Sequence, residues 1–277
     1  MSLPLQFSDW FQEKGWTAYP HQLEMVDRVS AGQSILLLAP TGAGKTLSGF
    51  LPSLIDLSHT PRTGLHTLYL SPIKALAVDI ARNLEAPISE MGLPISVETR
   101  TGDTPQAKRN RQRSAPPNML MTTPESLELM LSWPDAEKVF NCLKLIIIDE
   151  IHALSGTKRG DLLSLSLSAL RHLAPQSQSI GLSATVGAPD RFRPWLSPEP
   201  EKVYILQAKL TKTIDLSILE TETERLPWSG HGGLYAAVEI YKLIAKYRPC
   251  LIFVNTRAQA ELLFQALWVH NDLTLKI

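Results

Sequence analysis

The chain has 277 residues, of which 44% are hydrophobic and 19% charged, and its 27 Lys and Arg residues balance 27 Asp and Glu residues. This composition excludes global disorder, and the length allows one or two domains with a substantial hydrophobic core. Two widely separated cysteines exclude a disulfide framework and a cysteine-rich zinc site. The zero net charge also counts against a nucleic-acid-binding protein, because such proteins are usually basic.

Neither a signal peptide nor a membrane span is predicted. Residues 1–15 lack the basic start and apolar stretch of a signal peptide, and no apolar run approaches the roughly 18 residues that would cross a bilayer. We therefore expect a cytoplasmic protein with no membrane partner. Cys142 and Cys250 both stand in apolar surroundings, so we expect buried, inert thiols.

Short apolar segments alternate with amphipathic segments along the first 200 residues, which is typical of an α/β fold with a parallel sheet. Each apolar segment is almost unbroken in hydrophobicity, as expected for strands covered on both faces. Strands are predicted at residues 34–39, 67–70, 95–98, 119–122, 143–148 and 179–182. Helices are predicted at residues 21–29, 45–57, 75–88, 124–131, 162–173 and 190–196.

The pattern changes over residues 197–232, where prolines, charges and turn residues indicate a domain junction. Beyond it the sequence predicts helices at 235–245 and 256–268, a strand at 250–254, and the start of another strand at 273–277. We therefore expect a first domain over residues 1–206 and a second over residues 207–277.

The strongest local signal is the phosphate loop, APTGAGKT at residues 39–46, which lies between a predicted strand and a predicted helix. Small residues let successive backbone N–H groups face a polyphosphate, and the helix N-terminus adds positive partial charge. Lys45 is predicted to reach the β- and γ-phosphates, and the Thr46 hydroxyl to bind Mg²⁺. Predicted nucleotide contacts also include Thr41, Gly42, Ala43 and Gly44. The loop begins with Ala39 where the strict pattern has Gly, and the alternative is a glycine-rich turn that caps a helix.

An acidic pair, Asp149-Glu150, follows the strand predicted at 143–148. In a phosphate-loop protein, an acid at this place completes the Mg²⁺ site, which suits Asp149. Glu150 is then placed to orient and deprotonate the attacking water. Two solvated acids at a strand end are the alternative. Together with Lys45 and Thr46, the pair predicts ATP or GTP hydrolysis with Mg²⁺. ATP is favoured because no guanine-reading Asn/Thr-Lys-x-Asp string has the right spacing.

These segments follow one another in the order of the motifs of superfamily 2 helicases. Residues 39–46, 149–152 and 183–185 resemble motifs I, II and III, and SPIKAL at 71–76 and TTPES at 122–126 resemble motifs Ia and Ib. The strings DEIHALSGTKRGD, GLSATVGAPDRFRPWL, LPWSGHGG and IFVNTRAQAELLFQALW resemble the Lhr-like family, specifically its ligase-associated DEXH-box branch. The resemblance implies a RecA-like P-loop NTPase, with a mostly parallel sheet covered by helices on both faces and an incomplete second RecA-like domain.

The resemblance also implies roles for residues around the nucleotide. Gln22 matches the glutamine that contacts adenine, the alternative being an exposed residue at a helix start. Ser183 and Thr185 are implied to couple the nucleotide site to the nucleic-acid site, with His152 bridging toward them. For His152 the alternative is a core histidine bound to a backbone carbonyl.

Motifs Ia and Ib imply contacts to the phosphates of one nucleic-acid strand, made without reading its sequence. The candidates are Ser71, Lys74, Thr101, Gly102, Thr123, Ser126 and Arg257. Residues 100–113, including a predicted helix, carry five basic residues and one acidic residue, and they are either a contact surface or a solvated face. Lys158 and Arg159 form a smaller basic spot with the same two interpretations. The aromatic residues Trp10, Phe11 and Trp16 are expected to pack rather than to stack on a base.

Superfamily 2 motors bind ATP between two RecA-like domains, the second of which supplies arginine fingers in motif VI. The chain ends soon after residues 250–257, which resemble motif IV, so we expect a truncated helicase. The resemblance implies an ATP-dependent DNA helicase or translocase that moves 3′ to 5′ on single-stranded or partly duplex nucleic acid in DNA repair, with possible association with a DNA ligase. The alternatives are a motor on RNA or RNA–DNA hybrids, and a module that binds ATP or nucleic acid without turnover. We expect this chain alone to bind Mg-ATP weakly, hydrolyse it slowly and unwind nothing.

Overall fold

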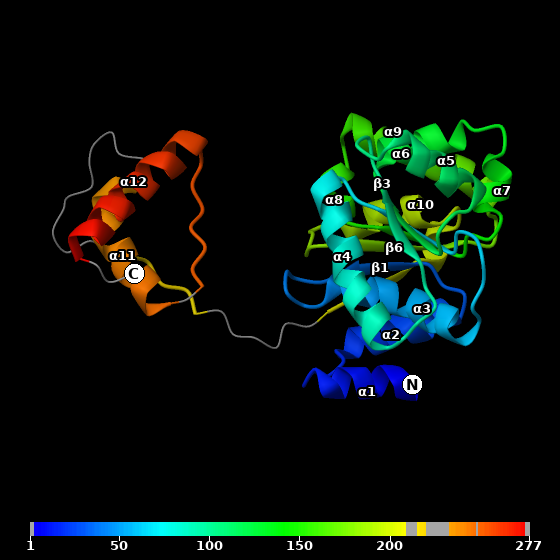
Figure 1. Cartoon of the computed structure of the whole chain (residues 1–277), viewed down its shortest axis with the longest axis horizontal. Helices are drawn as coiled ribbons and strands as arrows, with labels where there is room; N and C mark the ends of the chain where they lie inside the picture. Colours follow the sequence, from blue (N-terminus) through cyan, green and yellow to red (C-terminus); the bar gives the residue numbers. More distant parts are fainter. Residues whose placement is uncertain (1–2, 209–214, 220–232, 248, 275–277) are drawn as a thin grey trace. The chain divides into compact units, whose positions relative to one another are not determined.

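The computed structural model describes residues 3–208, 215–219, 233–247 and 249–274, with side chains up to residue 272 (Figure 1). The chain divides into two compact units, Met1–Thr211 and Lys212–Ile277. Among the described helices, none has the length and apolar character needed to cross a membrane. Cys142 and Cys250 are both exposed, so the expectation of buried thiols was wrong.

A seven-stranded sheet forms the centre of the first unit, in the order β3-β4-β2-β5-β6-β1-β7, and all neighbouring strands are parallel. The strands are β1 (Ile35–Leu38), β2 (Thr67–Leu70), β3 (Val97–Arg100), β4 (Met119–Thr122), β5 (Leu145–Ile148), β6 (Gln178–Ser183) and β7 (Tyr204–Gln207). The predicted α/β fold with a parallel sheet is therefore confirmed. β3 begins two residues later than predicted. β7 was not predicted, because this edge strand is only partly buried and lacks the continuous apolar run of a central strand.

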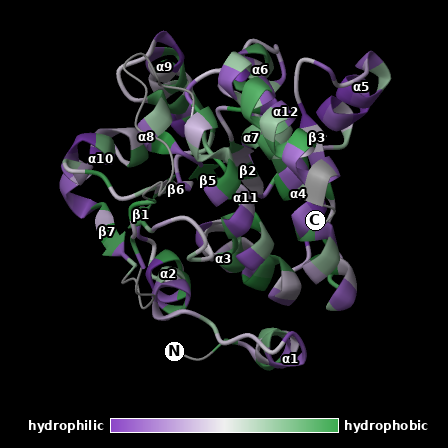
Figure 2. Ribbon diagram, turned by 90° about the vertical axis from the view of Figure 1, so that its left-hand side faces the viewer, coloured by the Kyte–Doolittle hydropathy of each residue, from purple (hydrophilic) through white to green (hydrophobic). Residues whose placement is uncertain are grey.

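Helices cover both faces of this sheet. They are α1 (Leu5–Glu13), α2 (Pro20–Ser30), α3 (Lys45–His59), α4 (Lys74–Glu90), α5 (Gln106–Ser114), α6 (Pro124–Leu131), α7 (Ala136–Phe140), α8 (Ile151–Leu154), α9 (Lys158–Leu173) and α10 (Arg193–Leu196). Ile35 and Leu37 of β1 pack into the core that α1–α4 cover, whereas Leu36 and Leu38 pack into the core under α6–α10. Figure 2 shows the hydrophobic residues concentrated along the strands and on the helix sides that face them.

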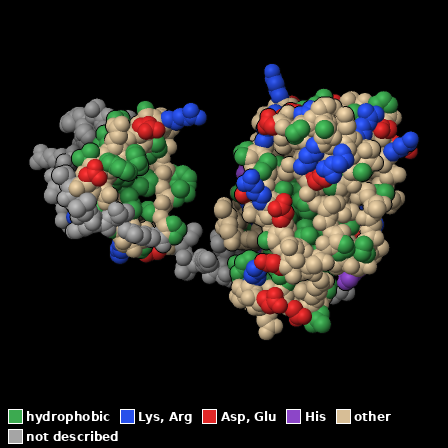
Figure 3. Space-filling model, viewed as in Figure 1, with side chains coloured by type: hydrophobic (Ala, Val, Ile, Leu, Met, Phe, Trp, Pro, Cys, Tyr) green, Lys and Arg blue, Asp and Glu red, His purple; other side chains and the backbone are tan. Residues whose placement is uncertain are grey.

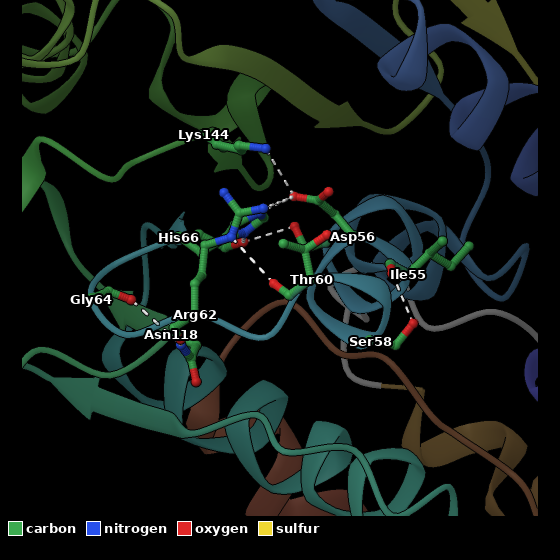
Figure 4. Close-up of polar contacts among 11 residues, drawn as sticks. Ile55, Asp56, Ser58, Thr60, Arg62, Gly64, His66, Asn118 and Lys144 are labelled. Carbon is green, nitrogen blue, oxygen red and sulfur yellow. Dashed lines mark hydrogen bonds and ion pairs between the residues drawn. The ribbon is translucent and has the colours of Figure 1, made fainter.

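A polar cluster occupies the edge of the sheet where β2 and β5 begin, at the end opposite the phosphate loop. Figure 4 shows Arg62, His66 and Lys144 directed toward the carboxylate of Asp56. His66 Nε2 lies 2.8 Å from Asp56 Oδ2, and the Lys144 ammonium donates to the same oxygen at 3.2 Å. Burial lowers the pKa of His66 and outweighs the hydrogen bond to Asp56. Burial alone would raise the pKa of Asp56, but hydrogen bonds from His66 and Lys144 hold it below its usual value.

This cluster predicts a loss of stability in mild acid. The pKa of His66 is lower in the folded chain than in the unfolded chain, so below about pH 6.5 the unfolded state binds a proton that the folded state does not. The free energy of unfolding should then fall with decreasing pH, by at most about 1.4 kcal/mol per pH unit from this one group. Urea titrations between pH 8 and pH 5 test this. H66Q should make the free energy of unfolding less dependent on pH, whereas the control H172Q, at an exposed position, should not. An H66Q chain whose stability depends on pH as steeply as that of the wild type would contradict the prediction.

The second unit contains a 3₁₀ turn (Leu234–Ala236), α11 (Ala237–Lys246) and α12 (Arg257–Thr274). Tyr241 joins the two helices, since its hydroxyl donates to Asn271 Oδ1 at 2.7 Å. The strand predicted at 250–254 was wrong, because these residues form no regular secondary structure and Phe253 is 86% exposed. A strand requires a hydrogen-bonded neighbour, and the described part of this unit offers none. The strand predicted from residue 273 was also wrong at its start, where α12 continues, and residues 275–277 lie outside the described residues.

Candidate functional site

The predicted nucleotide residues except Ala43 line one cleft of about 990 Å³ at the edge of the sheet where β1 and β5 end. Parallel α/β sheets characteristically bind ligands at the carboxyl ends of their strands. The phosphate loop contributes Thr41, Gly42, Gly44, Lys45 and Thr46, and the segment after β5 contributes Asp149 and Glu150. Gln22 lies at the same cleft, whose further part is lined by α1 and α4.

Two glycines give the phosphate loop its shape. Gly42 and Gly44 have φ angles of 81° and 69°, in the left-handed region that other residues rarely adopt. A Cβ atom on Gly44 would also lie 2.8 Å from Gln22 Nε2. His21 Nε2 contacts the Ala43 carbonyl at 2.9 Å, and Gln22 Nε2 donates to the Gly44 carbonyl at 3.5 Å. Two side chains at the start of α2 thus hold the backbone of the phosphate loop in place.

Gln22 is buried, with 2% of its surface exposed, which rules out the alternative of an exposed residue at a helix start. Its Oε1 accepts the Tyr19 backbone N–H at 2.9 Å, while its Nε2 holds the phosphate loop. This bond back to the N-cap backbone, which is one half of a capping box, fixes its position. The contact between Gln22 and adenine remains a prediction.

A chain of polar contacts runs from the phosphate loop to the end of β6. Lys45 Nζ lies 3.5 Å from Glu150 Oε1, and the other carboxylate oxygen of Glu150 lies 3.3 Å from His152 Nε2. His152 Nδ1 in turn lies 3.1 Å from Ser183 Oγ. β1 and β6 are neighbours, which brings Ser183 beside the loop. His152 thus contacts side chains rather than a backbone carbonyl, and Thr185, two residues beyond Ser183, is exposed.

Asp149 is buried and held from two sides. The Tyr69 hydroxyl donates to one carboxylate oxygen, and the Glu150 backbone N–H donates to the other at 2.9 Å. Burial raises the pKa of Asp149, and the Glu150 charge adds to this effect. Burial and the Asp149 charge also raise the pKa of Tyr69, so its phenol remains a donor. Tyr69 was not among the predicted site residues, although a tyrosine inside a fully buried strand needs a partner for its hydroxyl.

The residues present fit a magnesium ion. The Thr46 hydroxyl and the Asp149 carboxylate are hard oxygen donors, which Mg²⁺ prefers. No group of three His, Cys, Asp or Glu side chains among the described residues could hold a metal unaided.

Glu150 has a strained backbone. Its φ of 47° is the only positive φ among the described non-glycine residues. It is also the N-cap residue of α8, which begins at Ile151. A left-handed conformation costs a residue with a Cβ atom about 1–2 kcal/mol. Such strain is found most often at functional sites.

The candidates for nucleic-acid contact fall into two groups. Ser71, Thr101, Thr123 and Ser126 are buried, and their hydroxyls hydrogen-bond within their own loops. Lys74 and Gly102 are exposed at the surface, where the Lys74 ammonium donates to Asp103 at 3.2 Å. The buried hydroxyls therefore shape the loops, and a phosphate contact by the exposed Lys74 and Gly102 remains a prediction. Arg257 is exposed at the start of α12 in the second unit, and its role remains a prediction.

The basic residues on and beside α5 are largely paired. Arg111 binds Glu98 at 2.7 Å, and Arg113 binds Asp135 at 2.5 Å. Arg109 donates to the Gly102 carbonyl at 2.5 Å. On the face of the first unit in Figure 3, Lys and Arg side chains are scattered among acidic ones. This pairing favours the solvated-face interpretation over a basic contact surface.

The aromatic residues near the N-terminus pack on one another. Trp10 and Phe11 are buried, and their rings meet edge to face with 5.4 Å between centroids. Trp16 is 54% exposed, although its ring meets Trp10 edge to face at 5.6 Å. All three line the cleft, and Trp10 Nε1 donates to Glu90 at 2.7 Å. The expected packing is confirmed for Trp10 and Phe11, whereas Trp16 presents part of its ring to solvent.

Comparison with known proteins identifies the family. Residues 19–192 match the DEAD/DEAH box helicases. The chain belongs to this family. Most of the chain is also similar in sequence to Lhr helicases. It is 37% identical over 269 residues to the Lhr helicase/probable uracil glycosylase of Mycolicibacterium smegmatis, covering 91% of this chain and 18% of that protein. It is 35% identical over 275 residues to ATP-dependent helicase Lhr-Core protein 2 of Thermococcus barophilus, covering 91% of this chain and 32% of that protein.

Solved helicase structures agree with this assignment. Mycobacterium smegmatis helicase Lhr, bound to ssDNA and AMP-PNP, is similar with a TM-score of 0.82 and 35% identity, over 98% of this chain and 36% of that one. The DUF1998 helicase MrfA has a TM-score of 0.80 at 23% identity, over 99% of this chain and 42% of that one, and this supports the fold alone. The predicted RecA-like fold is therefore confirmed for this chain. The chain spans about a fifth to a third of the length of the two Lhr relatives.

Proposed function

We propose that the chain is the ATP-binding part of an Lhr-like helicase, which binds Mg-ATP in the cleft and hydrolyses it to move along a nucleic-acid strand. The observation that carries the proposal is the continuous contact chain from Lys45 through Glu150 and His152 to Ser183. It connects the phosphate loop to the segment that resembles motif III. Further support comes from the 35% identical M. smegmatis structure, which contains AMP-PNP and ssDNA.

In this proposal each residue has a chemical role. Backbone N–H groups of residues 41–46 and the Lys45 ammonium hold the phosphates, while Thr46 and Asp149 would hold Mg²⁺, which supplies positive charge to the phosphate oxygens. Glu150 accepts a proton from the water that attacks the γ-phosphorus, and the bond between that phosphorus and the ADP oxygen breaks. His152 transmits the resulting change at Glu150 to Ser183.

We infer that single-stranded or partly duplex DNA is the substrate, that movement is 3′ to 5′, and that the helicase acts in DNA repair in the cytoplasm alongside a DNA ligase. Resemblance to the ligase-associated branch supports them. The competing substrate is RNA or an RNA–DNA hybrid, because the candidate residues contact phosphates and do not distinguish the sugars.

Nucleic-acid-stimulated hydrolysis tests the proposal. We expect slow ATP turnover by the 277-residue chain, and single-stranded DNA should stimulate it more than RNA of equal length does. The turnover rate of K45A should be lower by a factor of about ten or more. Stronger stimulation by RNA would support the competing substrate. Turnover that neither nucleic acid changes, or that K45A retains, would contradict the proposal.

A further inference from the structure

Arg159, at the start of α9, bridges two other segments of the first unit. Its Nε and Nη2 atoms donate to the two carboxylate oxygens of Glu125 at 2.5 and 3.2 Å. Its Nη1 atom donates to the Pro72 carbonyl at 2.8 Å. Paired hydrogen bonds between a guanidinium and a carboxylate fix geometry as well as charge. This one side chain therefore ties α9 to the start of α6 and to the loop after β2.

The segments that Arg159 joins are the two candidate nucleic-acid loops, residues 71–74 and 123–126. Pro72 lies between Ser71 and Ile73, whose carbonyl accepts the Ser71 hydroxyl at 3.1 Å. Glu125 lies in the first turn of α6, beside Ser126, whose Oγ lies 3.3 Å from Thr123 Oγ1. Burial alone would raise the pKa of Glu125, but the Arg159 hydrogen bonds lower it, so the carboxylate stays charged.

Arg159 is also closely connected to the catalytic segment. Glu150 caps α8, and three residues separate the end of α8 from α9. The two helices pack so tightly that a Cβ atom on Gly160 would lie 2.1 Å from the Leu154 carbonyl oxygen. Close-packed segments transmit strain, so we expect a displacement of α8 to reach α9 and Arg159 through this contact.

We propose that Arg159 is a positioning residue that holds the two nucleic-acid loops at a fixed separation and links that separation to the segment carrying Glu150. This inference rests on the proposed function, because it assigns those loops to a nucleic-acid strand. Each of the three nitrogens of the guanidinium donates one hydrogen bond to Glu125 or Pro72, so the two loops anchor Arg159 and it acts through them.

The affinity for single-stranded DNA tests this role. Anisotropy of a fluorescein-labelled oligothymidylate, titrated with the whole chain plus AMP-PNP, should show about tenfold weaker binding for R159Q, with R159K intermediate because lysine cannot form the paired bonds. Affinity for a fluorescent ATP analogue should be unchanged. R113Q is the matched control: it breaks a half-buried arginine–carboxylate pair with Asp135 and should bind DNA like the wild type.

E125Q separates positioning from direct contact. If Arg159 positions the loops, E125Q breaks the same bridge from the other side and weakens DNA binding as R159Q does. Tighter binding by E125Q would show that a released Arg159 binds phosphate directly, and would overturn the proposal. An R159Q affinity for DNA equal to that of the wild type would also overturn it. Failure of the wild-type chain to bind the oligonucleotide at all would instead refute the proposed function itself.

Discussion

The E150Q variant is expected to hydrolyse ATP about 10²–10⁴-fold more slowly than the wild type, which is the usual contribution of a general base. Glutamine keeps the shape of the side chain but cannot accept the proton. ATP affinity should stay equal or rise, because the Glu150 carboxylate that lies 3.5 Å from Lys45 Nζ loses its charge. Single-turnover hydrolysis and titration with a fluorescent ATP analogue measure the two effects separately. Unchanged turnover would remove Glu150 from its role as the base.

A second substitution at this position separates catalysis from folding. E150N should also abolish hydrolysis, yet it should raise the free energy of unfolding by about 0.5–1 kcal/mol, because asparagine tolerates both the left-handed φ and the N-cap position better than glutamate. E150Q should leave stability unchanged. Greater stability with lost activity would show that the strain at residue 150 is kept for function.

The G160A variant should lose about 1–3 kcal/mol of stability through overpacking. Glycine-to-alanine changes inside helices usually stabilise by about 1 kcal/mol, so the expected sign is opposite to the general trend. The added Cβ would lie 2.1 Å from the Leu154 carbonyl oxygen and 2.8 Å from the Trp195 ring, and neither the backbone nor the indole can yield cheaply.

A helical glycine in α3 provides the control for this prediction. A Cβ on Gly49 would meet Leu182 Cδ1 at 3.2 Å, the end of a flexible side chain, so G49A should cost less than G160A. Urea unfolding followed by circular dichroism measures both variants. A G160A chain as stable as the wild type would show that α8 and α9 can separate, and would weaken the link drawn between Glu150 and Arg159.

The sequence predicted six of the strands and the phosphate loop because these depend on local signals. A strand buried on both faces is continuously apolar, and a phosphate loop needs small residues before a helix. Features that depend on distant partners were missed or wrong. β7 is an edge strand whose only signal is its pairing with β1, and residues 250–254 are apolar enough for a strand but have no neighbour in the described part of their unit.

The same distinction applies to the site. The phosphate loop and the acidic pair after a buried strand predicted that Lys45, Asp149 and Glu150 act together, and the structure brings them into one cleft. Nothing in the sequence connects Tyr69 with Asp149, 80 residues away, or Arg159 with Glu125, 34 residues away. Each of these four residues is one polar residue among many in the sequence. The pairs meet because the parallel sheet places the ends of β2, β4 and β5 side by side.

Equilibrium binding of a fluorescent ATP analogue, with and without Mg²⁺, tests the central claim that this cleft is the nucleotide site. We predict Mg²⁺-dependent binding by the wild-type chain, binding at least as tight by E150Q, and at least about tenfold weaker binding by K45A, since an ammonium that pairs with phosphate contributes more than 1.4 kcal/mol. Equal affinity of K45A and the wild type, or binding that Mg²⁺ leaves unchanged, would contradict it.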